Sequence, residues 1–327
     1  MFNECVRSCL AGLLLLAMAG CTGEAAEDAP HFVTREGQGP DKWASAWLIS
    51  RFGPDDAELS VIGAAEIPPD SATPFDIPGS ELARTESRAS FEVIADAFSV
   101  EDPAVKELAA IIHEIEVNFW NPQLPPAAEA VESAYRRLQR RYYNAPRRQM
   151  AGCFIRFFDH VRQSIAEGTS VSAGLEDVCE GIGASEAGLL ADSTVPNEVS
   201  IPRLLDEMHD GAEVAFVDVR EPEEYDEAHI PGAINIPIRH FDKASLDELR
   251  SADYVVSYCI KDFRGFEMAR HIKRAGVERS VILKPYGLKG WVANGLPLSG
   301  RNAMGTEAAR RALAECVSAR GCSDEAI

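Results

Sequence analysis

The sequence predicts an α/β protein: a parallel sheet flanked by helices on the C-terminal side, preceded by a separate mixed α/β and mostly helical domain. Between 199 and 283, five short apolar or β-branched runs alternate with stretches of helical spacing, which is typical of strands buried between helices. Between 43 and 167, apolar residues recur mainly at helical spacing. A length of 327 residues and a hydrophobic content of 46% suffice for two cores.

Composition narrows the classes of function. The formal net charge is −20, which disfavours binding to a phosphate backbone, so we expect no nucleic-acid partner. The cysteines show no metal-type CxxC pair, and we expect neither a metal nor another cofactor.

The first residues form a separate segment. Residues 10–19 make a ten-residue apolar run, too short to span a bilayer but suited to the core of a signal peptide. The run leads into Ala-Gly-Cys21, which resembles the lipobox of bacterial lipoproteins. The resemblance implies a signal peptide over 1–20, lipid on Cys21 and a leash over 21–31. An ordinary cleaved signal, or a misplaced start codon ahead of a cytosolic protein, are the alternatives.

The lipoprotein resemblance also implies a location. Thr22 is not the aspartate that retains lipoproteins in the inner membrane. We therefore expect a periplasmic protein held on a membrane by its lipid anchor, with the outer membrane favoured.

Residues 32–120 predict a first folded domain. A helix is expected over 43–52, a strand over 59–62, and further helices over 90–97 and 103–114. A rigid turn is expected over 74–79.

Specific motifs in this domain resemble the chromate-resistance protein B family, in the part that is C-terminal there. They are Phe32-Val-Thr-Arg-Glu36, Trp47-Leu-Ile-Ser-Arg-Phe52 and Thr73-Pro-Phe-Asp-Ile-Pro-Gly79. The resemblance implies a link to chromate response. A cysteine common in the family is replaced within Ala44-Ser-Ala46, and a His and a Cys are replaced within 84–90. This chain therefore lacks groups that would bind a metal or reduce an oxyanion.

Residues 121–190 predict a helical connector. A proline-rich break precedes two helices over 127–167 that are hinged at 144–146. The connector holds a basic cluster that either binds an anion or pairs with the many acids of the chain: Arg136, Arg137, Arg140, Arg141, Arg147 and Arg148. Just before it, His113 with Glu114 and Glu116 either holds a cation or is a solvated helix end.

The stretch from Tyr254 to Gly265 predicts a nucleophile. Residues 254–258 read as a buried strand and 265–275 as a helix. The loop between them begins with Cys259, whose thiol would lie at a helix N-terminus that favours an anion. Lys261 and Arg264 add positive charge, so we expect the thiolate to form more easily than in a free cysteine. A buried inert cysteine is the alternative.

Motifs on both sides of this loop resemble the rhodanese (sulfurtransferase) family over about 199–300. They are Val217-Asp-Val-Arg-Glu-Pro-Glu-Glu-Tyr225, His229-Ile-Pro-Gly-Ala-Ile-Asn-Ile-Pro237 and Gly287-Leu-Lys-Gly-Trp291. The resemblance implies a rhodanese-like parallel sheet over 191–302. It also implies that Cys259 takes sulfur from a small donor, holds it as a persulfide and passes it to a thiol or cyanide-like acceptor.

The resemblance implies the remaining site residues as well. Substrate contacts are expected from Ile260, Lys261, Asp262, Phe263 and Arg264. Four residues separate Cys259 from Arg264, one fewer than in related phosphatase domains, so the cradle is expected to be sulfur-sized. Asp218 and Arg220 are expected to brace the domain.

The other cysteines suggest disulfides. A C-terminal helix and tail are expected over 303–327, and with the connector they carry four cysteines besides Cys259: Cys153, Cys179, Cys316 and Cys322. In an oxidising periplasm Cys153 would pair with Cys179 and Cys316 with Cys322. Four reduced, scattered cysteines are the alternative.

Two hypotheses of function follow. The first is an exported sulfurtransferase linked to chromate or oxyanion stress. The second is a module without turnover that senses an oxyanion or oxidant, or binds a protein partner, through the same two domains. The sequence identifies neither the sulfur donor nor a protein partner.

Overall fold

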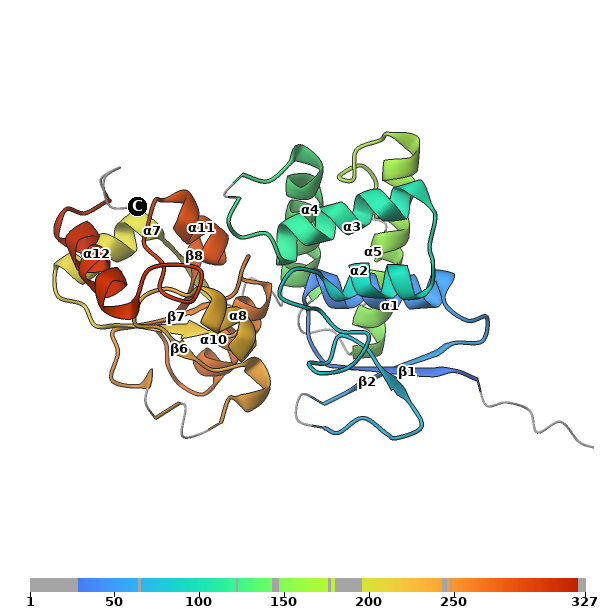
Figure 1. The fold of residues 1–327 in the computed structure, drawn as a ribbon, viewed down its shortest axis with the longest axis horizontal. Coiled ribbons are helices and arrows are strands. Elements are labelled where there is room, and N and C mark those ends of the chain that lie inside the picture. The colour runs from blue at the N-terminus through green and yellow to red at the C-terminus, as the bar shows by residue number, and fades with distance from the viewer. Residues whose placement is uncertain are drawn as a thin grey trace, which may run out of the picture.

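A computed structural model describes residues 29–63, 66–121, 123–142, 147–175, 178–179, 196–242, 246–247 and 249–322. Two lobes lie side by side, an N-terminal lobe over 31–167 and a C-terminal lobe over 197–318 (Figure 1). The expected signal peptide, Cys21 and most of the leash lie outside the described residues.

The C-terminal lobe is built on a five-stranded parallel sheet, which confirms the predicted fold class. The strand order is β4-β8-β7-β5-β6, and every neighbouring pair is parallel. Each predicted apolar run forms one strand: β4 (Asn197–Ser200), β5 (Val214–Asp218), β6 (Ile234–Asn235), β7 (Tyr254–Tyr258) and β8 (Ser280–Lys284).

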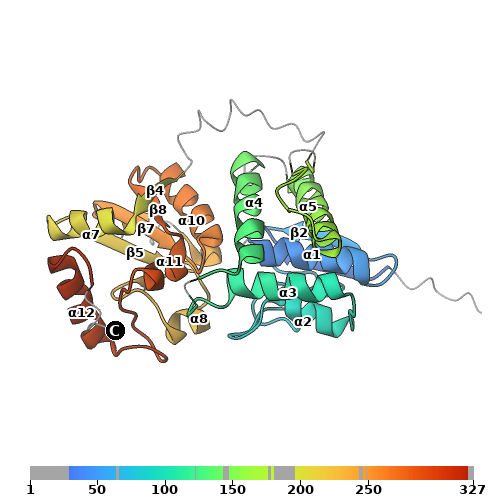
Figure 2. The same cartoon turned by 90° about the horizontal axis from the view of Figure 1, so that it is seen from above.

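Helices cover both faces of this sheet (Figure 2). Val217 and Val255 point toward α10 (Phe263–Arg274), whereas Phe216 and Val256 point toward the opposite core. The opposite core is covered by α7 (Ile201–His209), α11 (Gly287–Ala293) and α12 (Thr306–Ser318). Two short elements, α8 (Pro222–Glu227) and η1 (Ile238–His240), lie at the edge where β5 and β6 end.

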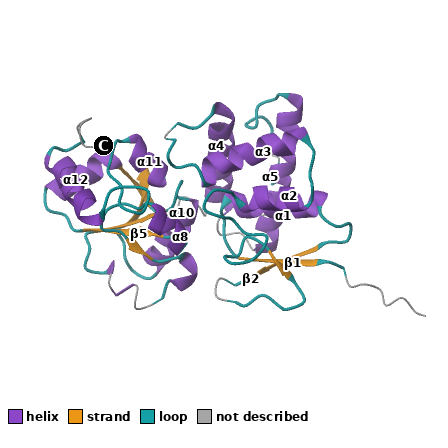
Figure 3. Cartoon of the chain, viewed as in Figure 1, coloured by secondary structure: helices purple, strands orange, loops and turns teal. Residues whose placement is uncertain are grey.

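The N-terminal lobe packs helices against a small parallel sheet (Figure 3). Strand β1 (His31–Arg35), which was not predicted, lies between β2 (Glu58–Ile62) and β3 (Thr73–Pro74). The helices are α1 (Pro40–Phe52), α2 (Ser90–Ala97), α3 (Pro103–Glu116), α4 (Pro126–Tyr142) and α5 (Arg147–Glu167).

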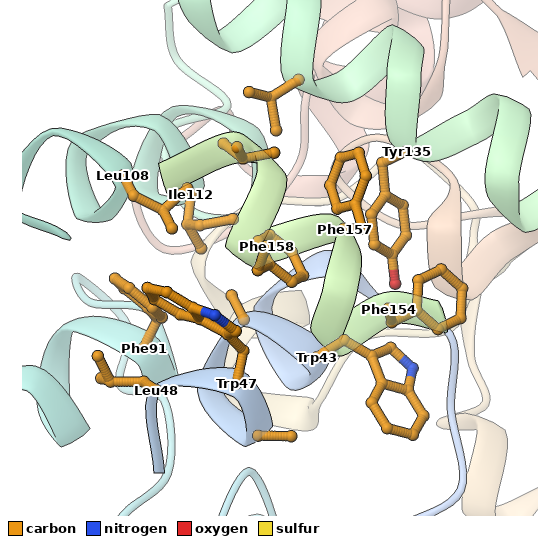
Figure 4. Close-up of a cluster of buried hydrophobic side chains, with 14 of the residues drawn as sticks. Trp43, Trp47, Leu48, Phe91, Leu108, Ile112, Tyr135, Phe154, Phe157 and Phe158 are labelled. Atoms are coloured by element: carbon orange, nitrogen blue, oxygen red, sulfur yellow. The ribbon is translucent and has the colours of Figure 1, made fainter. Parts of the chain in front are cut away.

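Helices α4 and α5 belong to the core of the N-terminal lobe, although the sequence predicts them as a connector (Figure 4). Trp47 of α1 stacks on Phe91, with ring centroids 6.3 Å apart, and also contacts Phe158 of α5. Tyr135 of α4 stacks on Phe154 at 4.9 Å. The apolar faces of the two helices therefore complete a core that α1 to α3 leave open.

The two lobes exchange aromatic side chains. Phe119, just after α3, packs in the core of the C-terminal lobe, and Phe263 of α10 packs in the core of the N-terminal lobe. Each side chain is almost completely buried, so separating the lobes would expose both rings to water.

The structure joins the four cysteines expected in disulfides. Cys153 is bonded to Cys179 with Cα atoms 5.0 Å apart, and Cys316 to Cys322 with Cα atoms 4.4 Å apart. Cys259 is a free, buried thiol. Among the described helices, none has both the length and the apolar character to cross a membrane.

Candidate active site

The Cys259 loop joins the central strand β7 to helix α10. The helix begins at Phe263, two residues before the predicted start, so the loop itself is Cys259, Ile260, Lys261 and Asp262. Gly265 lets the helix approach the strand, because a Cβ atom there would lie 2.8 Å from the Ser257 carbonyl oxygen. The Gly265 N–H donates a hydrogen bond to the Cys259 thiol. The thiol therefore lies at the N-terminus of α10, where the sequence predicts it.

The loop backbone is fastened by helix α11. Leu288 N donates to the Cys259 carbonyl at 2.8 Å, and Lys289 N donates to the Ile260 carbonyl at 3.1 Å. Gly287 has a φ of +63°, and a Cβ atom there would come within 2.4 Å of both carbonyl oxygens. A glycine at this position is therefore required for α11 to hold the loop.

Asp262 braces the loop from inside. Its backbone is left-handed, with φ at +59°, and its Oδ1 accepts from Cys259 N at 3.2 Å while Oδ2 accepts from Leu283 N at 3.0 Å. Burial raises its pKa to about 7, against the opposing effects of Arg136 and of these N–H groups. The carboxyl group thus faces the protein interior, in place of the expected contact with a substrate.

The Cys259 thiol is fully buried, and burial raises its pKa. Arg264 and the Gly265 N–H oppose this shift, while Glu116 and Asp262 add to it. The expectation of an easily formed thiolate is therefore wrong for this closed structure. The sequence reveals the cations beside the thiol, but it does not reveal the burial or the carboxylates that outweigh them.

Lys261 is paired across the lobe boundary. Its Nζ lies 3.0 Å from Glu132 Oε2 of α4, and both side chains are nearly buried. Its backbone carbonyl accepts a hydrogen bond from Arg136, one turn further along α4. In this closed arrangement the N-terminal lobe neutralises a cation that was expected to bind a substrate.

Arg264 forms a bidentate ion pair within the C-terminal lobe. Its Nη1 and Nη2 each lie 3.0 Å from an oxygen of Glu224, on α8. Arg84 of the N-terminal lobe lies 3.6 Å from the same carboxylate. Burial would raise the pKa of Glu224, but Arg264 and Arg84 hold it well below its ordinary value, so this carboxylate stays charged.

Ile260 and Phe263, also expected as substrate contacts, are buried in hydrophobic cores. The Phe263 ring lies edge-on to Tyr135 with centroids 5.4 Å apart, and the Arg136 guanidinium lies 4.3 Å from its centre. Both side chains therefore anchor the loop and leave Cys259, Lys261 and Arg264 as its chemical groups.

Two members of the basic cluster pair internally. Arg136 bonds to Glu132 at 2.8 Å and stacks on Tyr286, whose ring centre is 3.5 Å away. Arg140 pairs with Glu198 of β4. The side chains of Arg147 and Arg148 lie outside the described residues. Helix α4 thus uses this cluster to bind the C-terminal lobe.

Asp218 and Arg220 brace the sheet edge beside the site. Arg220 Nη2 lies 2.7 Å from Asp218 Oδ2 and also donates to the Ala228 carbonyl at 2.5 Å. His229 stacks on Tyr225 and bonds to its carbonyl at 2.8 Å. His113 bonds to Glu92 at 3.0 Å, and within the described ranges no three His, Cys, Asp or Glu side chains are placed to hold a metal ion.

Three acidic residues near the site were not singled out for it by sequence reasoning. Glu224 lies inside the motif quoted above for the rhodanese family, and Glu116 was considered only for a cation. Glu132 carried no signal at all, because its partner Lys261 is 129 residues away. All three act through the packing of the two lobes.

Comparisons with known proteins match both lobes. The model of the ChrB C-terminal domain matches residues 32–164, and the rhodanese-like domain model matches 201–294. The first match extends through α4 and most of α5, in agreement with the single core of the N-terminal lobe.

Relatives resemble one lobe at a time. Thiosulfate:glutathione sulfurtransferase of Saccharomyces cerevisiae is 36% identical over 25% of this chain and 67% of its own length. A sulfurtransferase of Allochromatium vinosum is 28% identical over 31% of this chain and 94% of its own length. Protein ChrB of Cupriavidus metallidurans is 33% identical over 31% of this chain and 30% of its own length.

Coverage differs among the relatives. The chain spans 52% and 59% of the length of two further relatives, from Bacillus subtilis and Synechocystis. The geometry of the Cys259 loop, the parallel sheet and the two domain matches agree. The chain therefore belongs to the rhodanese-like family, with a ChrB C-terminal domain preceding its rhodanese-like domain.

Proposed function

We propose that this protein is a sulfurtransferase that carries sulfur as a persulfide on Cys259. The observation that carries the proposal is the position of the free thiol at the end of β7, with the Gly265 N–H donating to its sulfur and Arg264 five residues on. The rhodanese-like domain and relatives named sulfurtransferases support it.

The chemistry proceeds in two displacements. The Cys259 thiolate attacks the outer sulfur of a donor such as thiosulfate, the donor S–S bond breaks, and sulfite leaves with the electron pair. A thiolate acceptor then attacks the outer sulfur of the persulfide, and Cys259 leaves as a thiolate. N–H groups at the start of α10 and the Arg264 charge would stabilise the anionic sulfur in both steps.

The closed structure sets a condition on this reaction. A donor must reach a thiol that is fully buried, beside a lysine that is paired with Glu132. Turnover therefore requires the loop and α4 to separate, at least locally.

A donor and acceptor panel tests the proposal. Purified protein is offered thiosulfate, a low-molecular-weight persulfide or polysulfide, with cyanide or glutathione as acceptor. We expect transfer with at least one pair, and a mass increase of one sulfur atom on the peptide that contains Cys259. Cys259→Ser should show neither, with an unchanged circular dichroism spectrum. Equal transfer by this variant would contradict the assignment.

A sensing or partner-binding module without turnover is the second candidate. It is favoured by the burial and raised pKa of Cys259 and by the engagement of Lys261 in an ion pair. The similarity to ChrB supports a link to chromate or another oxyanion for either candidate. Absence of transfer with every donor, together with oxidation of Cys259 by an oxidant, would favour this candidate.

We also propose that the protein acts outside the cytoplasm, attached to a membrane by lipid on Cys21. This proposal rests on the sequence of the first 21 residues. The bonded pairs Cys153–Cys179 and Cys316–Cys322 are compatible with an oxidising compartment.

A further inference from the structure

A cavity of about 110 Å³ lies where the two lobes meet. Its wall combines the start of α1, the turn after β3, the end of α3, and residues of η1 and α10. A volume of this size has room for about four water molecules, or for one small tetrahedral ion. Cys259 is not part of the wall, but Arg264 is.

The start of α1 presents backbone donors to this cavity. Gly39 is the N-cap residue, and no side chain caps the helix. The first-turn N–H groups of Asp41 and Lys42 have no carbonyl partner within the helix, so this end of a 13-residue helix favours an anion. The Asp41 carboxylate does not fill this role, since its oxygens accept from Ser90 N and Phe91 N at the start of α2.

Three buried polar atoms in the wall have no hydrogen-bond partner: Arg84 Nε, Arg264 Nε and Glu116 Oε1. The Glu116 side chain is only 3% exposed. The arginines spend their Nη atoms on Glu224 and on Glu116, which leaves each Nε as a donor. Unpartnered buried donors and acceptors cost free energy unless a ligand satisfies them.

The arrangement of charge selects the ligand. Two guanidinium donors and a helix N-terminus call for oxygen atoms with negative charge. Glu116 is surrounded by Arg84, Arg264, Asp41 and Glu224, and burial raises its pKa to about 7. A carboxyl group that exchanges a proton near neutrality suits an oxyanion that itself keeps a proton.

We propose that this cavity binds a small inorganic oxyanion, held by the start of α1, Arg84 and Arg264, with Glu116 facing it. Arg84 and Glu116 come from the N-terminal lobe and Arg264 from the C-terminal lobe, so the anion bridges the lobes. The site shares Arg264 with the sulfur-transfer loop, but it does not need Cys259 to react. It would let the concentration of an oxyanion alter how firmly α4 closes over that loop.

Binding is measured on the Cys259→Ser protein, so that failure of sulfur transfer does not affect the result. Titration calorimetry at pH 8 uses sodium phosphate, sulfate, sulfite, thiosulfate and chromate, with sodium chloride at matched ionic strength as the control. We expect saturable binding of one ion per chain for at least one oxyanion. Preference for sulfite or thiosulfate would tie the site to sulfur chemistry, whereas similar binding of phosphate and chromate would make it a general oxyanion site.

Variants with opposite expected effects locate the site. Arg84→Gln removes a donor and should weaken binding at least tenfold. Glu116→Gln removes a charge that repels the anion at pH 8, and should tighten binding severalfold even if Arg84→Gln folds poorly. Arg203→Gln is the matched control, because Arg203 is exposed on α7 and pairs only with its helix neighbour Glu207 among the described contacts. No saturable binding of any oxyanion, or equal affinities for the Arg84 and Arg203 variants, would overturn the proposal.

Discussion

Lys261 of the Cys259 loop and Glu132 of α4 form an ion pair between the lobes, with Nζ and Oε2 3.0 Å apart. Their side chains are 11% and 7% exposed, so the pair is shielded from water on most sides. One turn further along α4, Arg136 donates to the Lys261 carbonyl and lies over the Phe263 ring. Helix α4 therefore acts on the loop through its charge, its backbone and its aromatic anchor.

Removing the Glu132 charge should open the site. In Glu132→Gln, Lys261 loses its partner, and we expect Cys259 to be alkylated about three to ten times faster than in wild type, which corresponds to loss of about 1 kcal/mol of closure. The freed lysine should favour anionic iodoacetate over neutral iodoacetamide. Glu129→Gln, an exposed change on the same helix, is the control. Identical rates for the two variants would show that this pair does not restrict access.

Arg264 and Lys261 should differ in what they support. Arg264→Ala leaves the buried Glu224 without its bidentate partner, so we expect a loss of about 3–5 kcal/mol in the free energy of unfolding as well as of activity. Lys261→Ala should reduce the use of an anionic donor while destabilising the fold much less. Denaturant unfolding and donor kinetics on both proteins separate the two effects. An Arg264→Ala protein with wild-type stability would contradict the role given to the Glu224 pair.

Glu116 should make stability depend on pH. Its ordinary pKa of 4.5 rises to about 7 in the folded protein, mainly through burial. A raised carboxyl pKa gives stability that is fully present below about pH 4.5 and is lost as pH rises through 7. Relative to Glu116→Gln, wild type should therefore lose up to about 3 kcal/mol of unfolding free energy between pH 4.5 and pH 8.

Chemical denaturation at the two pH values tests this, with Glu129→Gln as the control for a carboxylate that is exposed. A difference between wild type and Glu116→Gln that stays constant with pH would mean that Glu116 titrates in the folded protein as it does in the unfolded chain.

Cys21 should carry lipid and form the first residue of the mature protein. The apolar run over 10–19 followed by Ala-Gly-Cys21 is the basis, and two or more acyl chains give lasting attachment where one does not. Mass spectrometry of the N-terminal peptide from the native host, together with membrane fractionation, measures both. An unmodified peptide that begins at Met1 in a soluble fraction would rule out the lipid anchor.

The sequence by itself determined the parts that depend on near neighbours. Alternating runs between 199 and 283 predicted every strand of the C-terminal sheet, and helical spacing predicted α1 to α5 within a few residues. The position of Cys259 between strand and helix followed from the same local patterns. Strand β1 was missed because five residues, His31–Arg35, carry too little periodicity to define a strand.

Only the tertiary structure decided the electrostatics and the closure of the site. Arg136 and the Lys261 carbonyl that it contacts are 125 residues apart, and no periodicity connects them. The direction of the Cys259 pKa follows from burial and from Glu116, which the packing of the lobes brings close. Local sequence fixes which groups a loop carries. How far those groups are removed from water, and which charges face them, depends on how distant segments pack, and that balance decides whether the thiol is reactive or closed.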